Sequence, residues 1–360
     1  MHQIVFRTDA TFQIGSGHFM RCLTLAKELS LRGSRCTFIT RNLPEFLRKA
    51  LVANGFSHIE LPIHSGLKSA DGLMHSSWLG VSQSVDALEV VQVMNNLRSD
   101  WLVVDHYSLD YRWEGIISEL VKKILVIDDI ADRRHDCDLL LDQNLYIDPS
   151  YRYKDKVPID CKLLLGPKYS LLRKEFEWLH KVAKPKIGSV RKVVVFFGGV
   201  DKDNFTQVAI NALEQINNQD IEVDIVIGTQ HPNREEIEKL CKSLQYTCHI
   251  QTENLAEIFA KADLGVGAGG SSSWERCCLA LPTLQVSLAE NQIAISDVLN
   301  QFGACLYLGK AEDISVEKLL EQIKFIIEDE SKRSEMSKIA YSLVDGLGVK
   351  RVCDEMGLGK

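Results

Sequence analysis

The sequence has 360 residues, of which 45% are apolar and 25% charged, an ordinary globular composition with enough chain for about two domains. The formal net charge of −7 argues against nucleic acid as a partner. No apolar run approaches the roughly 20 residues of a membrane-spanning helix, and the first residues enter a strand-like run without a signal-peptide pattern. The ten cysteines include no C-x-x-C pair, which predicts reduced side chains rather than a zinc site. We therefore expect a cytoplasmic protein that binds neither membrane nor nucleic acid.

Strand and helix patterns alternate along the first half of the chain. Residues 4–7 and 36–40 are short apolar strands, and a glycine-rich turn and an apolar helix lie between them. Residues 101–105 and 124–128 are nearly continuous apolar runs that end in aspartate. Because such runs are typical of strands buried on both faces, we predict parallel sheet covered by helices.

The alternation loosens within residues 151–188, where three prolines lie among charged residues, and then restarts. We predict an α/β fold of two Rossmann-like parallel-sheet domains that face a central cleft. The predicted parts are an N-terminal domain (1–165), an interdomain linker (166–190), a C-terminal domain (191–312) and a helical tail (313–360).

The first strand is followed by the turn Gly15, Ser16, Gly17 and His18. Glycine permits a tight turn and close approach of a ligand, and the helix that begins here offers free N–H groups and partial positive charge. That charge disfavours imidazolium, so His18 would be the neutral ring that a general base needs; local capping or packing of His18 is the alternative. The pattern is not a dinucleotide-binding fingerprint, because it lacks the third glycine and has Arg41 in place of the later acidic residue.

A second turn of this kind holds Gly269, Gly270, Ser271 and Ser272, ahead of a helix that carries Glu275 in its first turn. Main-chain N–H groups and hydroxyls in such a turn make a cradle for phosphate. The Glu275 carboxylate would repel phosphate but can accept hydrogen bonds from both hydroxyls of a ribose. A capping box between Ser272 and Glu275 fits the same spacing and is the alternative.

Other strand ends also carry polar residues or glycines, as the ligand-binding edges of parallel sheets do. Asp105 can orient His18 or bind a sugar, and Tyr107 can donate a hydrogen bond to a substrate. Helix capping is the alternative for Asp105 and for Asn291 and Gln292. The residues at these ends are Asp105 and Tyr107, Gly198 and Gly199, and Asn291 and Gln292.

Two D-x-D pairs match a short metal–nucleotide motif. So short a match recurs by chance, and neither pair follows the right kind of element. We therefore predict no metal ligand and no cofactor. The pairs are Asp136 with Asp138 and Asp201 with Asp203.

Six short sequence motifs occur in order over about residues 4–310. Each motif by itself is weak evidence for a family, whereas the set is specific. They are 7–9 (RTD), 15–22 (GSGHFMRC), 105–107 (DHY), 165–173 (LGPKYSLLR), 197–199 (FGG) and 269–276 (GGSSSWER). With this set the chain resembles the UDP-2,4-diacetamido-2,4,6-trideoxy-β-L-altropyranose hydrolases of pseudaminic acid biosynthesis.

The resemblance implies the GT-B fold, similar to the glycosyltransferase that makes lipid II, and inverting hydrolysis at the anomeric carbon without a metal. His18 matches the family's general base, Tyr107 its cleft tyrosine and Asn291 the asparagine of its N-Q pair. Glu275 matches the glutamate that holds the ribose in the related transferases. The partner is then a small-molecule UDP-sugar, bound by the C-terminal domain, and the tail packs back on the first domain as GT-B tails do.

Two other enzyme classes fit the same motifs. One is a GT-B glycosyltransferase with a UDP-amino-sugar donor, and the other is a hydrolysing UDP-amino-sugar 2-epimerase, which needs further acids to abstract the proton at C2. A non-catalytic sugar-nucleotide binder is the third class, and His18 argues against it. The sequence predicts neither the oligomeric state nor the glycoconjugate that receives the product.

Overall fold

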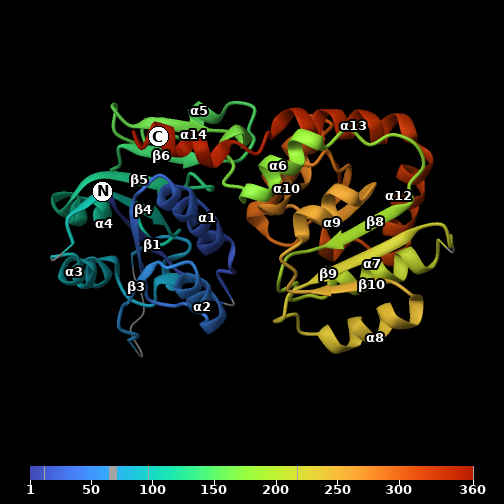
Figure 1. Ribbon diagram of the computed structural model, residues 1–360, viewed down its shortest axis with the longest axis horizontal. Coiled ribbons are helices and arrows are strands. Elements are labelled where there is room, and N and C mark those ends of the chain that lie inside the picture. The colour runs from blue at the N-terminus through green and yellow to red at the C-terminus, as the bar shows by residue number, and fades with distance from the viewer. Residues whose placement is uncertain (12, 65–70, 96, 217, 360) are drawn as a thin grey trace. The chain divides into compact units, whose positions relative to one another are not determined.

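The computed structural model describes residues 1–11, 13–64, 71–95, 97–216 and 218–359 (Figure 1). Its contacts divide the chain into two compact units, each built around one parallel sheet. Unit 1 consists of Met1–Asn144, Asp148–Leu171 and Gly348–Lys360, and unit 2 consists of Leu145–Ile147 and Leu172–Leu347.

The sheet of unit 1 has seven parallel strands. In spatial order they are β3 (Ser57–Glu60), β2 (Arg35–Thr40), β1 (Gln3–Thr8), β4 (Ser99–Asp105), β5 (Val121–Ile127), β6 (Leu139–Asp142) and β7 (Lys162–Leu165). The chain order reverses between β1 and β4, and open α/β sheets bind ligands outside the carboxyl ends of the strands at such a point. Thr8, the last residue of β1, pairs with Asp105, the last residue of β4.

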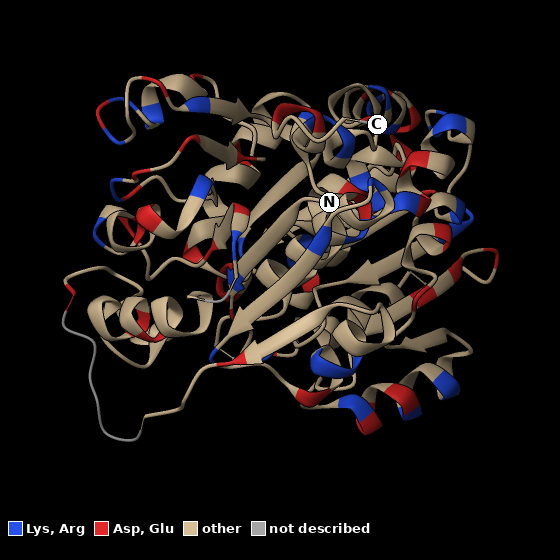
Figure 2. Cartoon of the chain, turned by 60° about the vertical axis from the view of Figure 1, so that its left-hand side comes forward, with Lys and Arg blue, Asp and Glu red and all other residues tan. Residues whose placement is uncertain are grey.

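Helices cover both faces of this sheet. They are α1 (Gly17–Leu31), α2 (Glu45–Ala53), α3 (Gln83–Met94), α4 (Tyr111–Ile117), α5 (Pro149–Arg152) and α14 (Gly348–Glu355), with short helical turns at Ser76–Leu79, Ser118–Leu120 and Pro167–Tyr169. Ile4 and Phe6 of β1 join the core shared with α1, α2 and α14, whereas Val5 joins the core shared with α3 and α4. Burial on both faces explains the continuous apolar runs of the sequence, and the strands carry few charges (Figure 2).

Unit 2 repeats this plan with six parallel strands. They are, in spatial order, β10 (Thr247–Ile250), β9 (Glu222–Ile227), β8 (Lys192–Phe196), β11 (Leu264–Ala268), β12 (Thr283–Ser287) and β13 (Leu306–Lys310). Its helices are α6 (Lys174–Val182), α7 (Phe205–Glu214), α8 (Arg234–Leu244), α9 (Leu255–Lys261), α10 (Ser272–Cys278), α11 (Ile293–Gln301), α12 (Val316–Glu328) and α13 (Glu330–Leu343), with turns at Glu290–Gln292 and Ala311–Asp313. The chain order reverses between β8 and β11, so the carboxyl ends of these two strands are where a ligand is expected to bind in unit 2.

The segment that follows β13 is divided between the units. Leu319 and Ile323 of α12 and Met336 of α13 lie in the core of unit 2. α14 instead packs against α1 in unit 1, where the Trp101 indole N–H donates to the carbonyl oxygen of Met356 at 3.1 Å. α6, which lies in the range predicted as a linker, packs against α9 and α10 within unit 2.

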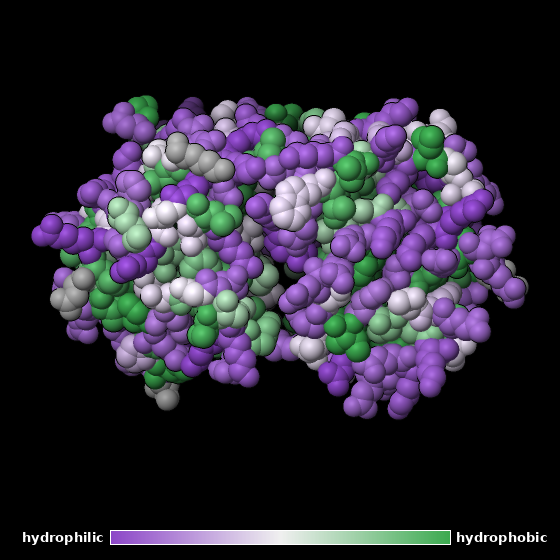
Figure 3. Space-filling model, in the orientation of Figure 1, coloured by the Kyte–Doolittle hydropathy of each residue, from purple (hydrophilic) through white to green (hydrophobic). Residues whose placement is uncertain are grey.

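No helix among the described residues combines the length and the apolar character that crossing a membrane requires. On the face drawn in Figure 3, apolar residues occur in small groups among polar ones.

Gly348 at the start of α14 gives a test of the packing of unit 1. A Cβ at this position would collide with the carbonyl oxygen of Ser170. We expect Gly348→Ala to destabilise the protein by about 1–3 kcal/mol, the usual cost of overpacking, and to lower the Tm in a thermal melt. Gly115→Ala is the control, because nothing lies within 4 Å of a Cβ added there in α4. Equal melting temperatures for the two variants would contradict the tight approach of α14.

Candidate functional site

His18 lies in the first turn of α1, directly after the turn that follows β1. Gly15 has a φ of +76°, which favours glycine, and its N–H donates to the carbonyl oxygen of Thr11 at 2.8 Å. Ser16 is the N-cap residue of α1 and makes no side-chain capping bond. His18 does not cap the helix either, because its Nδ1 lies 2.6 Å from Oδ1 of Asp105.

Asp105 is completely buried and is held by charge on two sides. Arg21, one turn after His18, donates to both of its carboxylate oxygens, at 2.6 and 2.7 Å. Burial by itself would raise the pKa of Asp105, but Arg21 and His18 outweigh it and hold the pKa well below its ordinary range. An ionised Asp105 only accepts hydrogen bonds, so Nδ1 of His18 carries the proton and Nε2 is left as the basic atom.

Tyr107 packs against His18 and donates its hydroxyl elsewhere. The two rings meet edge to face with centroids 4.5 Å apart. The Tyr107 hydroxyl donates to Oδ2 of Asp129 at 2.8 Å, and Arg21 Nη1 donates to the same oxygen at 2.6 Å. Burial and the charge of Asp129 raise the pKa of Tyr107 well above its usual value, so the phenol is neutral. Its single proton is engaged with Asp129, and its predicted contact with a substrate stays a prediction.

Sequence reasoning assigned no role to Arg21 or Asp129, and it missed two rings that contact Tyr107, those of Trp78 and His75. Arg21 follows His18 by three residues and so shares its helix face, a signal that the sequence did contain. Trp78 and His75 come from an aperiodic segment that carries no such signal. The Trp78 ring stacks on Tyr107 at 5.6 Å, and the His75 ring lies 5.3 Å from Tyr107.

In unit 2, two glycine turns lie at the ends of neighbouring strands. Phe196 of β8 pairs with Gly267 of β11. Gly198 has a φ of +97°, and the carbonyl of Gly199 lies so close to Gly228 that a Cβ on Gly228 would collide with it. The sequence therefore needs glycine here for a close approach of two backbones.

The turn of Gly269, Gly270, Ser271 and Ser272 follows β11. Gly269 donates its N–H to the Val286 carbonyl at 2.9 Å, and a Cβ on it would collide with Ser296. The N–H groups of the next three residues have no hydrogen-bond partner within the described part of the chain. The capping-box alternative is wrong, because α10 begins at Ser272, and its N-cap residue, Ser271, makes no side-chain capping bond.

Arg276, which the sequence reasoning did not select, holds this turn in place. Its buried guanidinium donates to the Ala268 carbonyl oxygen at 2.7 Å and to Ser272 Oγ at 3.0 Å. It also donates to Ser273 Oγ and Gln285 Oε1. All four partners of the guanidinium are neutral oxygens, and Arg276 forms no ion pair with a carboxylate of the described residues. Burial lowers its pKa. A buried cation without a counter-charge is costly unless an anion meets it, which makes this turn electropositive.

Three further predicted residues lie in this part of unit 2. Oε1 of Glu275 is 3.8 Å from Nη2 of Arg173, and burial raises the pKa of Glu275. Gln292 accepts the Leu288 N–H through Oε1 at 2.9 Å, and its Nε2 lies 3.7 Å from a Cβ built on Gly270. Asn291 is exposed in the turn that precedes α11.

The D-x-D pairs have ordinary structural partners. Asp201 accepts the N–H groups of Phe205 and Thr206, at 3.0 and 2.8 Å, and so caps α7. Asp138 accepts the Ile124 N–H at 2.8 Å. The described residues contain no group of three or more His, Cys, Asp or Glu side chains suited to a metal ion.

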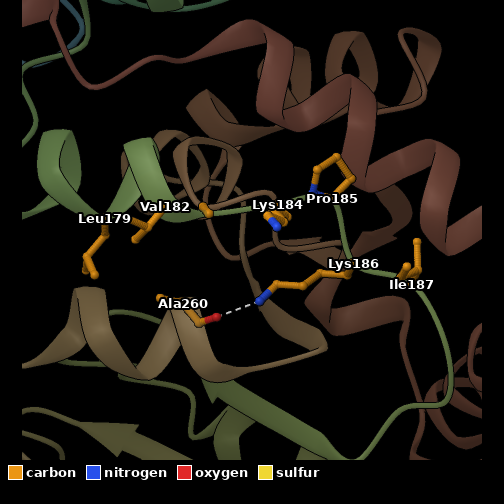
Figure 4. A pocket seen from close by; sticks show the side chains of 8 residues that line it. Leu179, Val182, Lys184, Pro185, Lys186, Ile187 and Ala260 are labelled. Atoms are coloured by element: carbon orange, nitrogen blue, oxygen red, sulfur yellow. Dashed lines mark hydrogen bonds between the residues drawn. The ribbon is translucent and has the colours of Figure 1, made fainter.

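A surface pocket of unit 2 lies elsewhere (Figure 4). Its polar group, Lys186 Nζ, donates to the Ala260 carbonyl oxygen at 2.5 Å. None of the predicted site residues lines it, and we assign it no role. The lining residues are Leu179, Val182, Ala183, Lys184, Pro185, Lys186, Ile187 and Ala260.

Comparisons with known proteins test the predicted family resemblance and the predicted fold. A family model for the glycosyltransferase family 28 C-terminal domain matches residues 193–351. The chain is 26% identical to the UDP-2,4-diacetamido-2,4,6-trideoxy-beta-L-altropyranose hydrolase of Campylobacter jejuni over 86% of this chain and 96% of that protein. It is 30% identical to the spore coat polysaccharide biosynthesis protein SpsG of Bacillus subtilis over 54% of this chain, and the match spans only 57% of SpsG, little more than half its length. The resemblance predicted from the motifs is confirmed.

MurG of Acinetobacter baumannii has a similar structure, with a TM-score of 0.67 at 13% identity and 99% of each chain covered. The chain has the GT-B fold. The predicted fold class of two parallel-sheet α/β domains is thereby confirmed, with seven strands in one GT-B unit and six in the other.

Asp105→Asn tests the charge network of the first GT-B unit. The substitution leaves the buried Arg21 with Asp129 as its one remaining carboxylate partner. We therefore expect the free energy of unfolding to fall by about 3 kcal/mol at neutral pH, the lower end of the range for a broken buried ion pair. Because folding lowers the pKa of Asp105, its contribution is present above the ordinary value of about 4 and is lost as the pH falls below it. Thermal melts of both proteins across this range should therefore converge at low pH.

The control for this test is Asp100→Asn, because Asp100 lies on the same strand and pairs with Lys122 at the surface. Lys122 and the Gln3 N–H lower the pKa of Asp100 as well, so Asp100→Asn should follow the same trend with pH but with a much smaller change in Tm. A difference between wild type and Asp105→Asn that stays constant with pH would contradict the role of ionised Asp105.

Proposed function

We propose that the chain is an enzyme that hydrolyses a UDP-linked 2,4-diacetamido-2,4,6-trideoxy sugar at the anomeric carbon, with inversion. The products are UDP and the free sugar, which would feed the synthesis of a pseudaminic-acid-type nonulosonate. The observation that carries this proposal is the contact of His18 Nδ1 with the buried Asp105, which leaves Nε2 as a base. The similarity to the Campylobacter jejuni hydrolase along nearly its full length supports it.

Unit 2 would bind the UDP portion of this substrate. The unpartnered N–H groups of Gly270, Ser271 and Ser272 suit the diphosphate, and the guanidinium of Arg276 supplies a buried positive charge beside them. Glu275 would accept the ribose hydroxyls, and Arg173 would hold its carboxylate in position. Because these groups meet the charge of the diphosphate, we propose a reaction that needs neither a metal nor a cofactor.

Water would attack the anomeric carbon from the face opposite UDP. His18 Nε2 takes one proton from that water as the new C–O bond forms. The bond between the anomeric carbon and the UDP oxygen breaks, and UDP leaves with the electron pair. The N–H groups and Arg276 of unit 2 stabilise the charge that develops on the leaving group.

A glycosyltransferase with the same donor is the second candidate, favoured by the family 28 domain match. The decisive experiment follows UDP release from UDP-2,4-diacetamido-2,4,6-trideoxy-β-L-altropyranose in the absence of any acceptor alcohol. Release of UDP, with a free sugar of inverted anomeric configuration by NMR, supports hydrolysis. Turnover that begins only when an acceptor is added would overturn it, and EDTA should leave the rate unchanged.

His18→Asn tests the proposed base. The kcat should fall by about 10²–10⁴, the usual contribution of general base catalysis. UDP binding measured by calorimetry should persist, because the nucleotide is bound by unit 2. His2→Asn is the control, since His2 is an exposed histidine of the same unit. A His18→Asn protein with a wild-type kcat would exclude this mechanism.

Glu275→Ala tests the ribose contact. UDP binding should weaken by about 1.5–3 kcal/mol, the range of a hydrogen bond to a charged group. The variant should also lose the preference for UDP over 2′-deoxy-UDP in calorimetry. Glu175→Ala is the matched control, because Glu175 pairs with the same Arg173 at 3.1 Å. Equal UDP affinity in the Glu275 and Glu175 variants would show that Glu275 makes no ribose contact.

A further inference from the structure

Gln285 lies on β12, almost completely buried beside the glycine turn of residues 269–272. A Cβ built on Gly269 would come within 3.1 Å of its Nε2. The Oε1 atom of Gln285 accepts from Arg276 Nη2 and from Ser273 Oγ, each at 3.0 Å, and both residues belong to α10. Its Nε2 donates to Ser296 Oγ of α11 at 2.8 Å. One side-chain amide therefore connects the two helices that begin beside this turn.

The hydrogen bonds of Ser296 fix the orientation of this amide. Ser296 donates its single hydroxyl proton to the Gln292 carbonyl oxygen at 2.7 Å, so its oxygen accepts from Gln285. The NH₂ group of Gln285 must then face Ser296, and the carbonyl oxygen must face Arg276. The orientation that receives the guanidinium is thus set from α11, on the far side of the amide.

The amide holds Arg276 without neutralising it. The guanidinium is buried, it meets only neutral oxygens among the described residues, and its Nε has no partner there. Glu275, its neighbour in the chain, lies 3.8 Å from Arg173 instead. A carboxylate in place of the Gln285 amide would have nearly the same shape and would supply the missing counter-charge. With glutamine at this position, the positive charge is left for a ligand.

We infer that Gln285 is a positioning residue for the diphosphate, an inference that rests on the proposed function. It keeps the guanidinium of Arg276 against the turn, where Arg276 donates to Ser272, and its neutrality leaves the diphosphate as the counter-charge. A negative charge at position 285 would compete with the phosphates for Arg276. UDP and uridine share the base and the ribose and differ in charge, so the effect of Gln285 has to appear as a difference between these two ligands.

Gln285→Glu is the test. Calorimetry gives the Kd of UDP, an NMR titration gives the Kd of uridine, and a thermal melt gives the Tm without ligand. UDP should bind about 10- to 100-fold more weakly, the range of a hydrogen bond to a charged group, and the Kd of uridine should stay unchanged. The Tm should be equal or higher, because the new carboxylate pairs with Arg276. Gln215→Glu is the matched control, since it adds the same charge at an exposed residue at the end of α7.

Ser296→Ala tests the orientation of the amide by a separate route, and it decides if Gln285→Glu does not fold. Without the acceptor on α11, the amide is able to turn its NH₂ group toward Arg276 and repel it. UDP should then bind about 2- to 10-fold more weakly, as expected for one neutral hydrogen bond, with uridine unchanged.

The outcomes separate this inference from the proposed function. A wild-type Kd for UDP in folded Gln285→Glu, or in Ser296→Ala, would overturn the role of Gln285 and leave the hydrolase intact. A lower Tm with equal losses for UDP and uridine would also overturn it, because Gln285 would then only support the packing. Turnover that depends on an acceptor would overturn hydrolysis alone, whereas a wild type that does not bind UDP would overturn both.

Discussion

One guanidinium organises the proposed catalytic side of the molecule. Arg21 bridges Asp105, at the end of β4, and Asp129, just after β5. Two carboxylates at neighbouring strand ends would repel each other without it, and burial by itself would favour the protonated form of Asp105. Because Arg21 keeps Asp105 ionised, Asp105 can hold the proton of His18 on Nδ1, and Tyr107 can donate to Asp129. The base, its orientation and the packing of the adjacent rings all depend on this bridge.

The second unit uses buried charge in the opposite way. Asp105 in unit 1 has its counter-charge within the fold, whereas Arg276 in unit 2 meets only neutral oxygens among the described residues. Because Arg21 neutralises its charge, Asp105 can stay ionised and in place while His18 takes up a proton. An unbalanced cation suits a turn whose counter-charge arrives with the ligand. The same sheet plan thus supports two different electrostatic tasks.

The sequence was sufficient for the fold class and for the turns, because both depend on local signals. Continuous apolar runs marked buried strands, and glycines marked the turns at their ends, as with Gly15 and Gly269. The partners of these turns were not accessible, because Arg21 and Asp129 are 108 residues apart and meet only through the order of β1, β4 and β5. A capping box between Ser272 and Glu275 needs Ser272 as the N-cap residue, but α10 begins at Ser272, one residue earlier than that box requires. Trp78 was missed because the segment that carries it has no hydrophobic periodicity.

The division of the last helices between the units has a consequence for how the chain is made. During synthesis the whole of unit 2, Leu145–Ile147 and Leu172–Leu347, leaves the ribosome before α14 does. Unit 1, although most of it is translated first, lacks until then the buried side chains of Val352 and Cys353 that close its core over α1. The core of the N-terminal unit is therefore complete only after the whole of unit 2 has been translated.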